Sequence, residues 1–325
     1  MPDRELRLLA DIGGTNARFA LQARGAAPAQ VDVTSCAEFA SLEDAVESYL
    51  EKARPDAPPR RAAFAVASPI AGDQVAMTNH PWRFSVSGAR ARLRLQELRV
   101  INDFAAIALA VPALGPGDLR RIGGGRAVAG APIAVIGPGT GLGVSILVPG
   151  PGGPIALATE GGHATLAVAD DREAQLVAWL RERFDHASAE RALSGPGLVN
   201  LYAALMELDG RAAPLPAPDE VTARAVDGSD ALAAEAVAMF CAMLGTVAGN
   251  LALTVGARGG IYIAGGIVPA LGTAFALSPF RSRFEDKGRF RPYVAAIPTA
   301  VITRDVPAFA GLAALLDGTG TTISG

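Results

Sequence analysis

Two short glycine-rich segments carry the clearest chemical signal in the sequence. The first turn, DIGGTN at 11–16, follows the apolar run LLA, and the second turn, GTGLG at 139–143, follows the apolar run IAVI and the pair GP. Apolar residues resume after each, so both turns are predicted to lie at the tips of β-hairpins. Glycine leaves the backbone N–H groups of such a tip open to a phosphate, because no side chain holds the anion away. Asp11 opens the first turn, where its carboxylate can hold Mg²⁺ or the waters of that ion.

Other glycine-based phosphate sites fit less well. A P-loop requires Lys followed by Ser or Thr, but the chain's two lysines are Lys52, followed by Ala53, and Lys287, followed by Gly288. A dinucleotide fingerprint requires a helix after its glycines, whereas both turns here lead into strand patterns. An ordinary tight hairpin with a solvated aspartate remains the alternative, and its recurrence in two corresponding places weakens it.

The elements that must position these turns alternate between strand and helix patterns, which indicates an α/β fold. A Pro/Gly-rich stretch at 112–132 is the expected boundary between two halves, and the order strand, glycine turn, strand occurs on both sides of it. Ser41 is predicted to cap a helix, with Asp44 three residues on. The terminal DGTGTTISG is expected to fray. Further strands are expected at 61–67, 98–101 and 259–266, and helices at 39–52, 231–255 and 308–316.

Composition narrows the class of protein. The 325 residues carry a formal net charge of -3, which gives no sign of a nucleic-acid partner or an acidic membrane and favours a small-molecule partner. The two cysteines, Cys36 and Cys241, form no Cys-x-x-Cys pair and are expected to be buried thiols. We expect no signal peptide and no segment able to span a membrane, for which an uncharged run of roughly 18 residues is needed. A soluble cytoplasmic protein is therefore expected.

Seven motifs resemble those of the bacterial glucokinases of the actin-like ATPase superfamily, in the same order along the chain. They are DIGGTNARFAL, INDFAAIALAVP, GPGTGLGVSIL, EGGHATLA, ERALSGPGLVNLY, IAGGIVP and FEDKGRF. The resemblance implies two ribonuclease-H-like α/β domains with a cleft between them, a small one of residues 1–113 plus 305–325 and a large one of residues 114–304. It also implies that ATP and Mg²⁺ are bound, that glucose is the partner substrate, and that the protein is a homodimer.

The resemblance also assigns roles to single residues. Asp103 matches the catalytic base, and it matches a sugar ligand together with Asn102; Glu160, His163 and Glu190 match the remaining sugar ligands. Carboxylates, an amide and an imidazole suit a ring of hydroxyls, each of which is both donor and acceptor. The positions that match the ATP site are Ala10, Asp11, Ile12, Gly13, Gly14, Thr15, Asn16, Gly139, Thr140, Gly141, Gly265 and Gly266, with Asp11 as the metal ligand.

Three of the sugar-side residues also have an ordinary structural interpretation. Asp103 precedes the helical pattern AAIALAV and would suit a helix N-cap. Glu160 would suit a plain surface turn, and Glu190 would suit a solvated charge. A zinc site at His163 is disfavoured, because no cluster of His and Cys accompanies it.

Two further segments keep an open interpretation. In the loop TNHPWRFS at 78–85, Asn79, His80 and Trp82 either contact substrate or pack against one another. The segment FEDKGRF at 284–290 gives no role beyond a charged turn at a surface or subunit interface.

The expected activity is transfer of the γ-phosphoryl group of ATP to the 6-hydroxyl of glucose, the first step of glycolysis. Asp103 would accept the proton of the attacking hydroxyl. The rivals are a kinase for another hexose, a non-catalytic sugar-sensing protein or regulator on the same scaffold, and an actin-like assembly protein. A regulator would need a DNA-binding appendage, for which the strand pattern beginning at Leu8 leaves no room.

Overall fold

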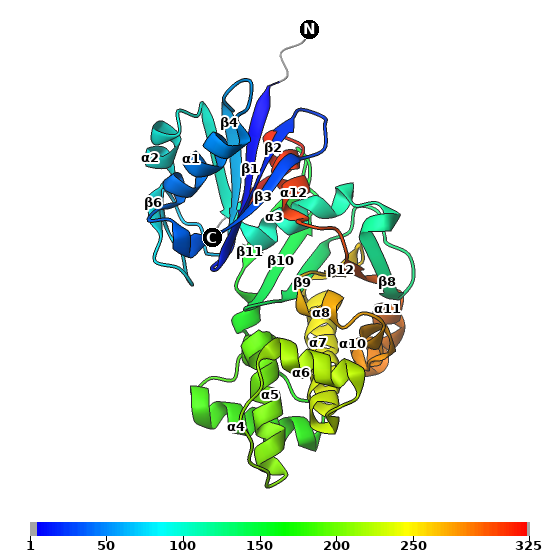
Figure 1. Cartoon of the computed structure of the whole chain (residues 1–325). Coiled ribbons are helices and arrows are strands. Elements are labelled where there is room, and N and C mark those ends of the chain that lie inside the picture. The colour runs from blue at the N-terminus through cyan, green and yellow to red at the C-terminus, as the bar shows by residue number, and fades with distance from the viewer. Residues whose placement is uncertain (1–4, 324–325) are drawn as a thin grey trace. The chain divides into compact units, whose positions relative to one another are not determined.

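The computed structural model describes residues 5–323. The chain divides into two compact units. The first unit comprises Met1–Leu114, Ile146–Ala158 and Arg304–Gly325, and the second comprises Gly115–Ser145 and Thr159–Thr303. Figure 1 shows the elements of both units, each of which mixes helices with strands.

The first unit is built on a five-stranded sheet with the order β3-β2-β1-β4-β7. Strands β1, β2 and β3 form an antiparallel meander, whereas β1, β4 and β7 run parallel. The three parallel strands end in register at Ile12, Val66 and Asn102, so the residues that follow them meet at one edge of the sheet. The strands are β1 (Leu6–Ile12), β2 (Asn16–Ala23), β3 (Ala29–Ser35), β4 (Arg61–Val66) and β7 (Glu97–Asn102).

Successive side chains of β1 and β4 point to opposite faces of this sheet, and helices pack against both faces. Leu8 and Phe64 belong to a cluster with the buried face of α1 (Leu42–Ala53), which Ser41 caps by accepting a hydrogen bond from the N–H of Asp44, as predicted. Helices α3 (Asp103–Ala110) and α12 (Ala308–Leu316) pack against each other and against β4. The sheet therefore lies between helical layers (Figure 1).

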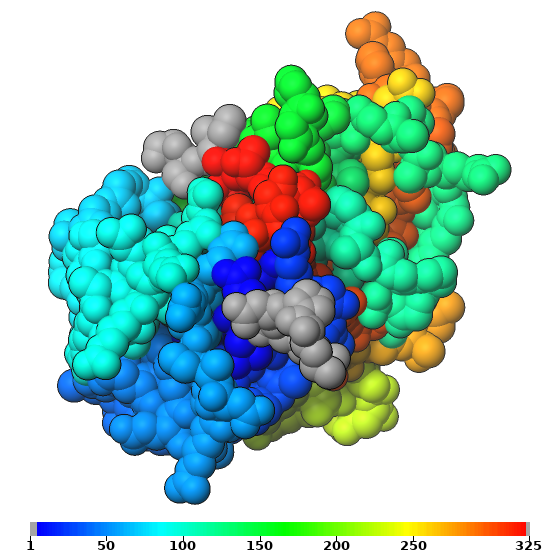
Figure 2. All heavy atoms as spheres, turned by 90° about the horizontal axis from the view of Figure 1, so that it is seen from above, coloured from blue at the N-terminus to red at the C-terminus, as the bar shows by residue number. Residues whose placement is uncertain are grey.

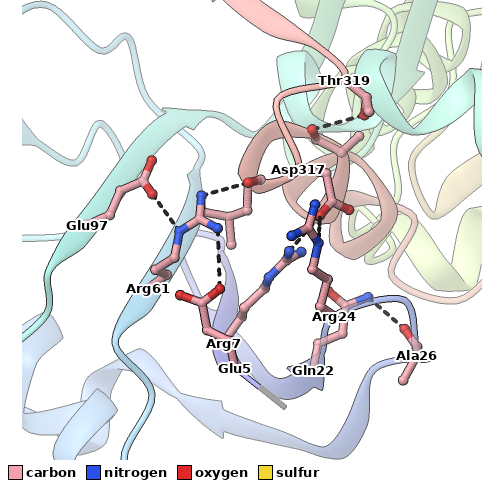
Figure 3. A network of polar contacts seen from close by, with 11 residues as sticks. Glu5, Arg7, Gln22, Arg24, Ala26, Arg61, Glu97, Asp317 and Thr319 are labelled. Atoms are coloured by element: carbon pink, nitrogen blue, oxygen red, sulfur yellow. Dashed lines mark hydrogen bonds and ion pairs between the residues drawn. The ribbon is translucent and has the colours of Figure 1, made fainter. Parts of the chain in front are cut away.

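An ion-pair network anchors the end of α12 to the sheet (Figure 3). The guanidinium of Arg7 is fully buried and donates to Asp317 Oδ1 over 2.5 Å. Arg61 donates to Glu97 Oε2 and to the carbonyl of Leu316, each over 2.6 Å. Figure 2 shows the result at the surface, where the C-terminal segment lies beside the N-terminal strands.

The expectation that the C-terminal residues fray is wrong for 321–323. Thr321–Ile323 forms β14, which pairs in parallel with β11 (Ile155–Thr159). The turn before β14 is fixed because Thr321 donates its N–H to the carbonyl of Pro154. Ser324 and Gly325 lie outside the described residues.

A seven-stranded sheet has the order β14-β11-β10-β9-β12-β13-β8. In the second unit, β12 pairs in parallel with both β9 and β13, and β8 closes the edge antiparallel to β13. The additional strands are β8 (Leu119–Gly123), β9 (Ile133–Pro138), β10 (Leu142–Val148), β12 (Gly260–Ile263) and β13 (Thr299–Ile302), and a separate hairpin joins β5 (Gln74–Ala76) and β6 (Arg83–Ser85).

The core of the second unit is helical and centres on α7 (Ala231–Val255), whose bounds match the sequence prediction. The expectation that no segment is long and apolar enough to span a membrane is wrong, because α7 meets both criteria. However, 67% of its apolar stretch is buried inside the protein, as in a core helix. The segment 284–290 helps to cover it, since Phe284 is fully buried and Lys287 donates to the carbonyl of Thr246 over 3.4 Å.

The other helices are shorter and connect or cover the strands. The α-helices are α2 (Val86–Arg92), α4 (Asp171–Phe184), α5 (Gly195–Leu208), α6 (Pro218–Asp227), α8 (Ile267–Ala270), α9 (Thr273–Leu277), α10 (Phe280–Glu285) and α11 (Arg291–Ala295). The 3₁₀ helices are η1 (Cys36–Glu38), η2 (Val111–Ala113), η3 (Pro116–Asp118), η4 (Gly161–His163), η5 (Ala189–Arg191) and η6 (Gly288–Phe290).

Candidate functional site

The first turn is the tip of the β1–β2 hairpin, as predicted. The N–H of Gly13 donates to the carbonyl of Asn16 over 3.0 Å and closes the tip. Ala10 and Ile12 are fully buried in β1, so their side chains support the turn from the core. Within residues 5–323, the N–H groups of Gly14 and Thr15 have no recorded hydrogen-bond partner. They are therefore available to an anion.

Asp11 is the carboxylate nearest to this tip along the chain. Burial raises the pKa of its carboxyl above the usual range, and Arg18 opposes the increase from across the hairpin, with its Nη1 3.5 Å from Asp11 Oδ2. A partly desolvated carboxylate that is paired with an exposed arginine suits a hard divalent ion that keeps most of its waters. The described residues contain no group of three or more His, Cys, Asp or Glu side chains placed to hold a metal by themselves. Asp11 therefore fits Mg²⁺ only as one ligand among waters and substrate oxygens.

The loop at 78–82 rests on the first turn. A Cβ added to Gly14 would lie 2.9 Å from Asn79 Cβ and 3.2 Å from its carbonyl oxygen, so glycine is required for this close approach. Trp82 is buried and donates its indole N–H to the carbonyl of Phe39 over 3.0 Å, and His80 packs edge-on against it. For His80 and Trp82, the structure supports the packing interpretation.

Asn102 ends β7 and Asp103 follows it, at the sheet edge where β1 also ends. The interpretation of Asp103 as a helix N-cap is wrong, because Asn102 is the cap and its Oδ1 accepts from the N–H of Ala105 over 3.1 Å. The amide of Asn102 also donates to the carbonyl of Ser68 over 3.4 Å. Asp103 is the first residue of α3, and its Oδ1 accepts from the N–H of Phe104 over 2.9 Å. Two strand spacings, about 10 Å, separate the ends of β1 and β7.

The second turn connects β9 to β10 in the second unit. The N–H of Gly139 donates to the carbonyl of Gly141, and the N–H of Gly195 at the start of α5 donates to the carbonyl of Gly139, each over 2.8 Å. Gly265 lies against this turn with φ +81°, and a Cβ on it would come within 2.2 Å of the carbonyl oxygen of Pro138. Only glycine permits that backbone contact.

A pocket of about 800 Å³ opens beside the second turn. Gly139, Thr140 and Gly266 form one part of its lining, and all three are among the positions predicted from the sequence. Its other lining residues are Leu198, Pro218, Asp219, Thr222, Ala223, Val226, Asp227, Ile267 and Ala270. Helix α6 supplies most of this second group, and sequence reasoning missed it. The only local signal was Pro218 at the start of a helix.

Glu160, His163 and Glu190 come together in the second unit. Their segments are paired through two hydrogen bonds, from the N–H of Leu166 to Ala187 O and from the N–H of Ala189 to Ala164 O, each 2.9 Å. His163 Nε2 lies 3.9 Å from Glu160 Oε2, and both side chains are about 60% exposed. These exposed polar groups can reach a bound ligand.

Glu190 is neither solvated nor isolated. Its Oε2 accepts a hydrogen bond of 2.8 Å from the N–H of Leu142, within the second turn. The same oxygen lies 2.5 Å from the position that a Cβ on Gly141 would take. The interpretation of Glu190 as a solvated charge is therefore wrong, and this carboxylate joins the cluster with Glu160 and His163 to the second turn.

Two exposed N–H tips, a large pocket beside one of them and a cluster of carboxylates and imidazole fit one class of protein, the α/β phosphotransferases that act on hydroxylated small molecules. The family model described as Glucokinase matches residues 8–319. The glucokinase of Paramagnetospirillum magneticum is 53% identical over 313 residues, which cover 96% of this chain and 98% of that relative. The glucokinase of Aromatoleum aromaticum is 53% identical over 312 residues, 96% of this chain and 94% of that relative.

Solved structures agree with these relatives. The crystal structure of a glucokinase from an Antarctic psychrotroph matches with a TM-score of 0.86 at 38% identity, covering 96% of this chain and 99% of that one. The chain belongs to the glucokinase family, and the family resemblance of its motifs is confirmed.

Proposed function

We propose that the chain transfers the γ-phosphoryl group of ATP to the 6-hydroxyl of glucose, with Asp103 as general base. The observation that carries the proposal lies in the first unit: Asn102 takes the capping role, and Asp103 stands at the sheet edge that also carries the first turn. Relatives about half identical to this chain are named Glucokinase, which supports glucose as the acceptor. A glucokinase structure from Streptomyces griseus, 18% identical with a TM-score of 0.64, is described in complex with glucose and AMPPNP, which supports this pair of substrates.

In this proposal the sugar is recognised through its hydroxyls. Asn102 and Asp103 bind it from the first unit, and Glu160, His163 and Glu190 bind it from the second. Carboxylates accept hydrogen bonds from sugar hydroxyls, and the amide of Asn102 can donate one, so each hydroxyl finds a partner of the required kind. A sugar that lacks a recognised hydroxyl leaves a polar protein group unpaired, which is costly.

The nucleotide is held mainly by backbone. The pocket beside the second turn is large enough for a nucleoside, and Gly266 with α6 provides close apolar contact. The positions that would hold ATP are those predicted from the sequence, Ala10 to Asn16, Gly139 to Gly141, and Gly265 with Gly266. The exposed N–H groups of the two turns would bind the β- and γ-phosphates.

Asp103 takes the proton from the 6-hydroxyl as that oxygen forms a bond to the γ-phosphorus and the bond to the ADP oxygen breaks. The turn N–H groups stabilise the negative charge on the phosphate oxygens. Asp11 would help to hold Mg²⁺, which supplies charge neutralisation on the phosphates when bound.

The proposal requires both units to act on one pair of substrates. We place the small domain at residues 1–113 plus 305–325 and the large domain at 114–304, with the substrates in a cleft that closes to exclude water. A homodimer in the cytoplasm is part of the same proposal, and the two buried free thiols suit a reducing compartment.

The substitution Asp103→Asn tests the central assignment. Asparagine keeps an oxygen that can accept the hydrogen bond from Phe104 N–H, but it cannot act as a base. We expect kcat to fall by about 10²- to 10⁴-fold while glucose still binds, measured as ADP release with ATP, Mg²⁺ and a panel of hexoses.

The matched control is Asp171→Asn. Asp171 is likewise the first residue of a helix, α4, behind its own cap, Asp170. We expect normal turnover in this control. Normal turnover in Asp103→Asn would refute the role of Asp103, and preference for another hexose in the wild-type panel would replace glucose as the substrate.

A further inference from the structure

Cys36 contacts the first turn at two points. It is the first residue of η1, directly after β3, and it is fully buried. Its N–H donates to the carbonyl of Thr15 over 2.8 Å, and its thiol donates to the carbonyl of Gly13 over 3.5 Å. One residue therefore holds both carbonyl groups that flank the tip of the hairpin.

The direction of these carbonyls fixes the direction of the neighbouring N–H groups. In a trans peptide the C=O and the following N–H lie in one plane and point in opposite directions. When Gly13 C=O points at the Cys36 thiol, the N–H of Gly14 points away from it. In the same way, the bond to Thr15 C=O turns the N–H of Asn16 away from Cys36.

The chemistry of the thiol suits this task. Burial raises the pKa of the Cys36 thiol, so the group stays protonated at neutral pH and can donate its S–H. The only polar atom recorded as accepting from this thiol is the carbonyl oxygen of Gly13, among the residues that the structure describes. The side chain packs in the core of the first unit, and its thiol group donates to the turn.

We propose that Cys36 is a positioning residue for phosphate binding: its thiol holds the Gly13 carbonyl inward so that the Gly14 N–H faces the phosphates of the nucleotide. The backbone bond to Thr15 can be made by any residue at position 36 except proline, whereas the bond to Gly13 depends on the side chain. This inference rests on the proposed use of the first turn as a phosphate site. Cys36 would thus support the nucleotide site from a buried position, without touching either substrate.

The test compares Cys36→Val, which fills the space without a donor, with Cys36→Ser, which keeps a hydroxyl donor. Binding of MgADP and of a non-hydrolysable ATP analogue is measured by calorimetry, beside KM for ATP, KM for glucose and the thermal midpoint. We expect Cys36→Val to weaken nucleotide binding by about two- to fivefold, which corresponds to one weak hydrogen bond. KM for glucose stays unchanged, and Cys36→Ser restores most of the affinity.

Cys241→Val is the matched control. Cys241 is also fully buried and hydrogen-bonded through its thiol, but it lies in α7 of the second unit and takes no part in either turn. We expect it to shift only the thermal midpoint. If Cys36→Val fails to fold, Cys36→Ala, which is smaller and also lacks a donor, gives the same comparison.

Equal nucleotide affinity of the folded Cys36→Val and Cys36→Ser variants would overturn the inference, because the donor would then have no effect. Equal weakening of nucleotide and glucose binding would also overturn it, because that pattern indicates general loss of structure. Failure of the proposed function is recognised separately, since the wild-type protein would then bind neither MgADP nor the ATP analogue.

Discussion

The two glycine turns look alike in sequence but are supported by different means. The first turn is held by hydrogen bonds from Cys36 and packs against the loop that carries Asn79, and neither support is charged. The second turn is held by the N-terminus of α5 through Gly195 N–H, and by the carboxylate of Glu190. In each turn, the supports hold carbonyl or N–H groups of the tip but do not occupy all of its N–H donors.

The two turns also differ in the role of the carboxylate that lies near each of them. Asp11 stands beside the first turn and suits the cation that accompanies a phosphate. Glu190 binds the second turn and belongs to the cluster with Glu160 and His163. One carboxylate therefore touches both the predicted nucleotide side and the predicted sugar side, and five substitutions can test this comparison.

The largest effect is expected for Glu190→Ala. It removes the acceptor for Leu142 N–H and a predicted sugar ligand together, and hydrogen bonds to charged groups contribute about 1.5–3 kcal/mol each. We expect kcat/KM for glucose to fall roughly 100-fold or more, with a smaller rise in KM for ATP. Steady-state kinetics with both substrates varied measures the two effects. A change confined to glucose would show that Glu190 does not support the second turn.

Asp11→Asn tests the cation at the first turn. We expect the affinity for Mg²⁺ to fall about 10- to 100-fold, measured from the Mg²⁺ dependence of turnover. In the wild type, the raised pKa of Asp11 means that the carboxylate is lost at a higher pH than for an ordinary aspartate, whose pKa is about 3.9. As the pH falls toward that range, turnover of the wild type should therefore require a higher concentration of Mg²⁺. The Mg²⁺ requirement of Asp11→Asn should not show this change with pH. The same pH trend in Asp11→Asn would assign it to another group.

Gly14→Ala and Gly139→Ala separate support of the turn from phosphate contact. A methyl on Gly14 meets Asn79, so the free energy of unfolding should drop by about 1–3 kcal/mol, whereas a methyl on Gly139 meets open space and should change it little. Both variants should bind ATP less tightly, because a side chain at either tip holds the phosphate away. Denaturant unfolding and ATP titration give the two readouts. Unchanged ATP binding in Gly139→Ala would remove the second turn from the phosphate site.

The smallest effect is expected for Ser194→Ala. Ser194 caps α5 by accepting from Gly197 N–H, and it precedes the residue whose N–H holds Gly139. Loss of such a cap costs about 1 kcal/mol of stability. Thermal unfolding should show this decrease, together with a slight rise in KM for ATP. Ser41→Ala, which removes the equivalent cap of α1, is the control and should leave KM for ATP unchanged.

Much of the fold follows from local patterns that the sequence displays. The bounds of α7 and α12 match the periods of their apolar residues, and the caps Ser41 and Ser194 match their residue types. The terminal residues 321–323 escaped prediction because their order comes from pairing with β11, more than 160 positions earlier in the chain. The apolar length of α7, by contrast, stands in the sequence itself, and only the tertiary structure shows that most of this helix is buried.

For the site, the sequence by itself determined which chemical groups are present. These groups are the backbone N–H groups of two glycine turns, a carboxylate beside one of the turns, and polar side chains suited to a sugar. Only the tertiary structure decided that Asn102 rather than Asp103 caps α3, that Glu190 binds the second turn, and that α6 lines the pocket beside that turn. The physical reason is that a residue type fixes which bonds a group can make, whereas the partner it finds depends on how segments distant in the chain pack together.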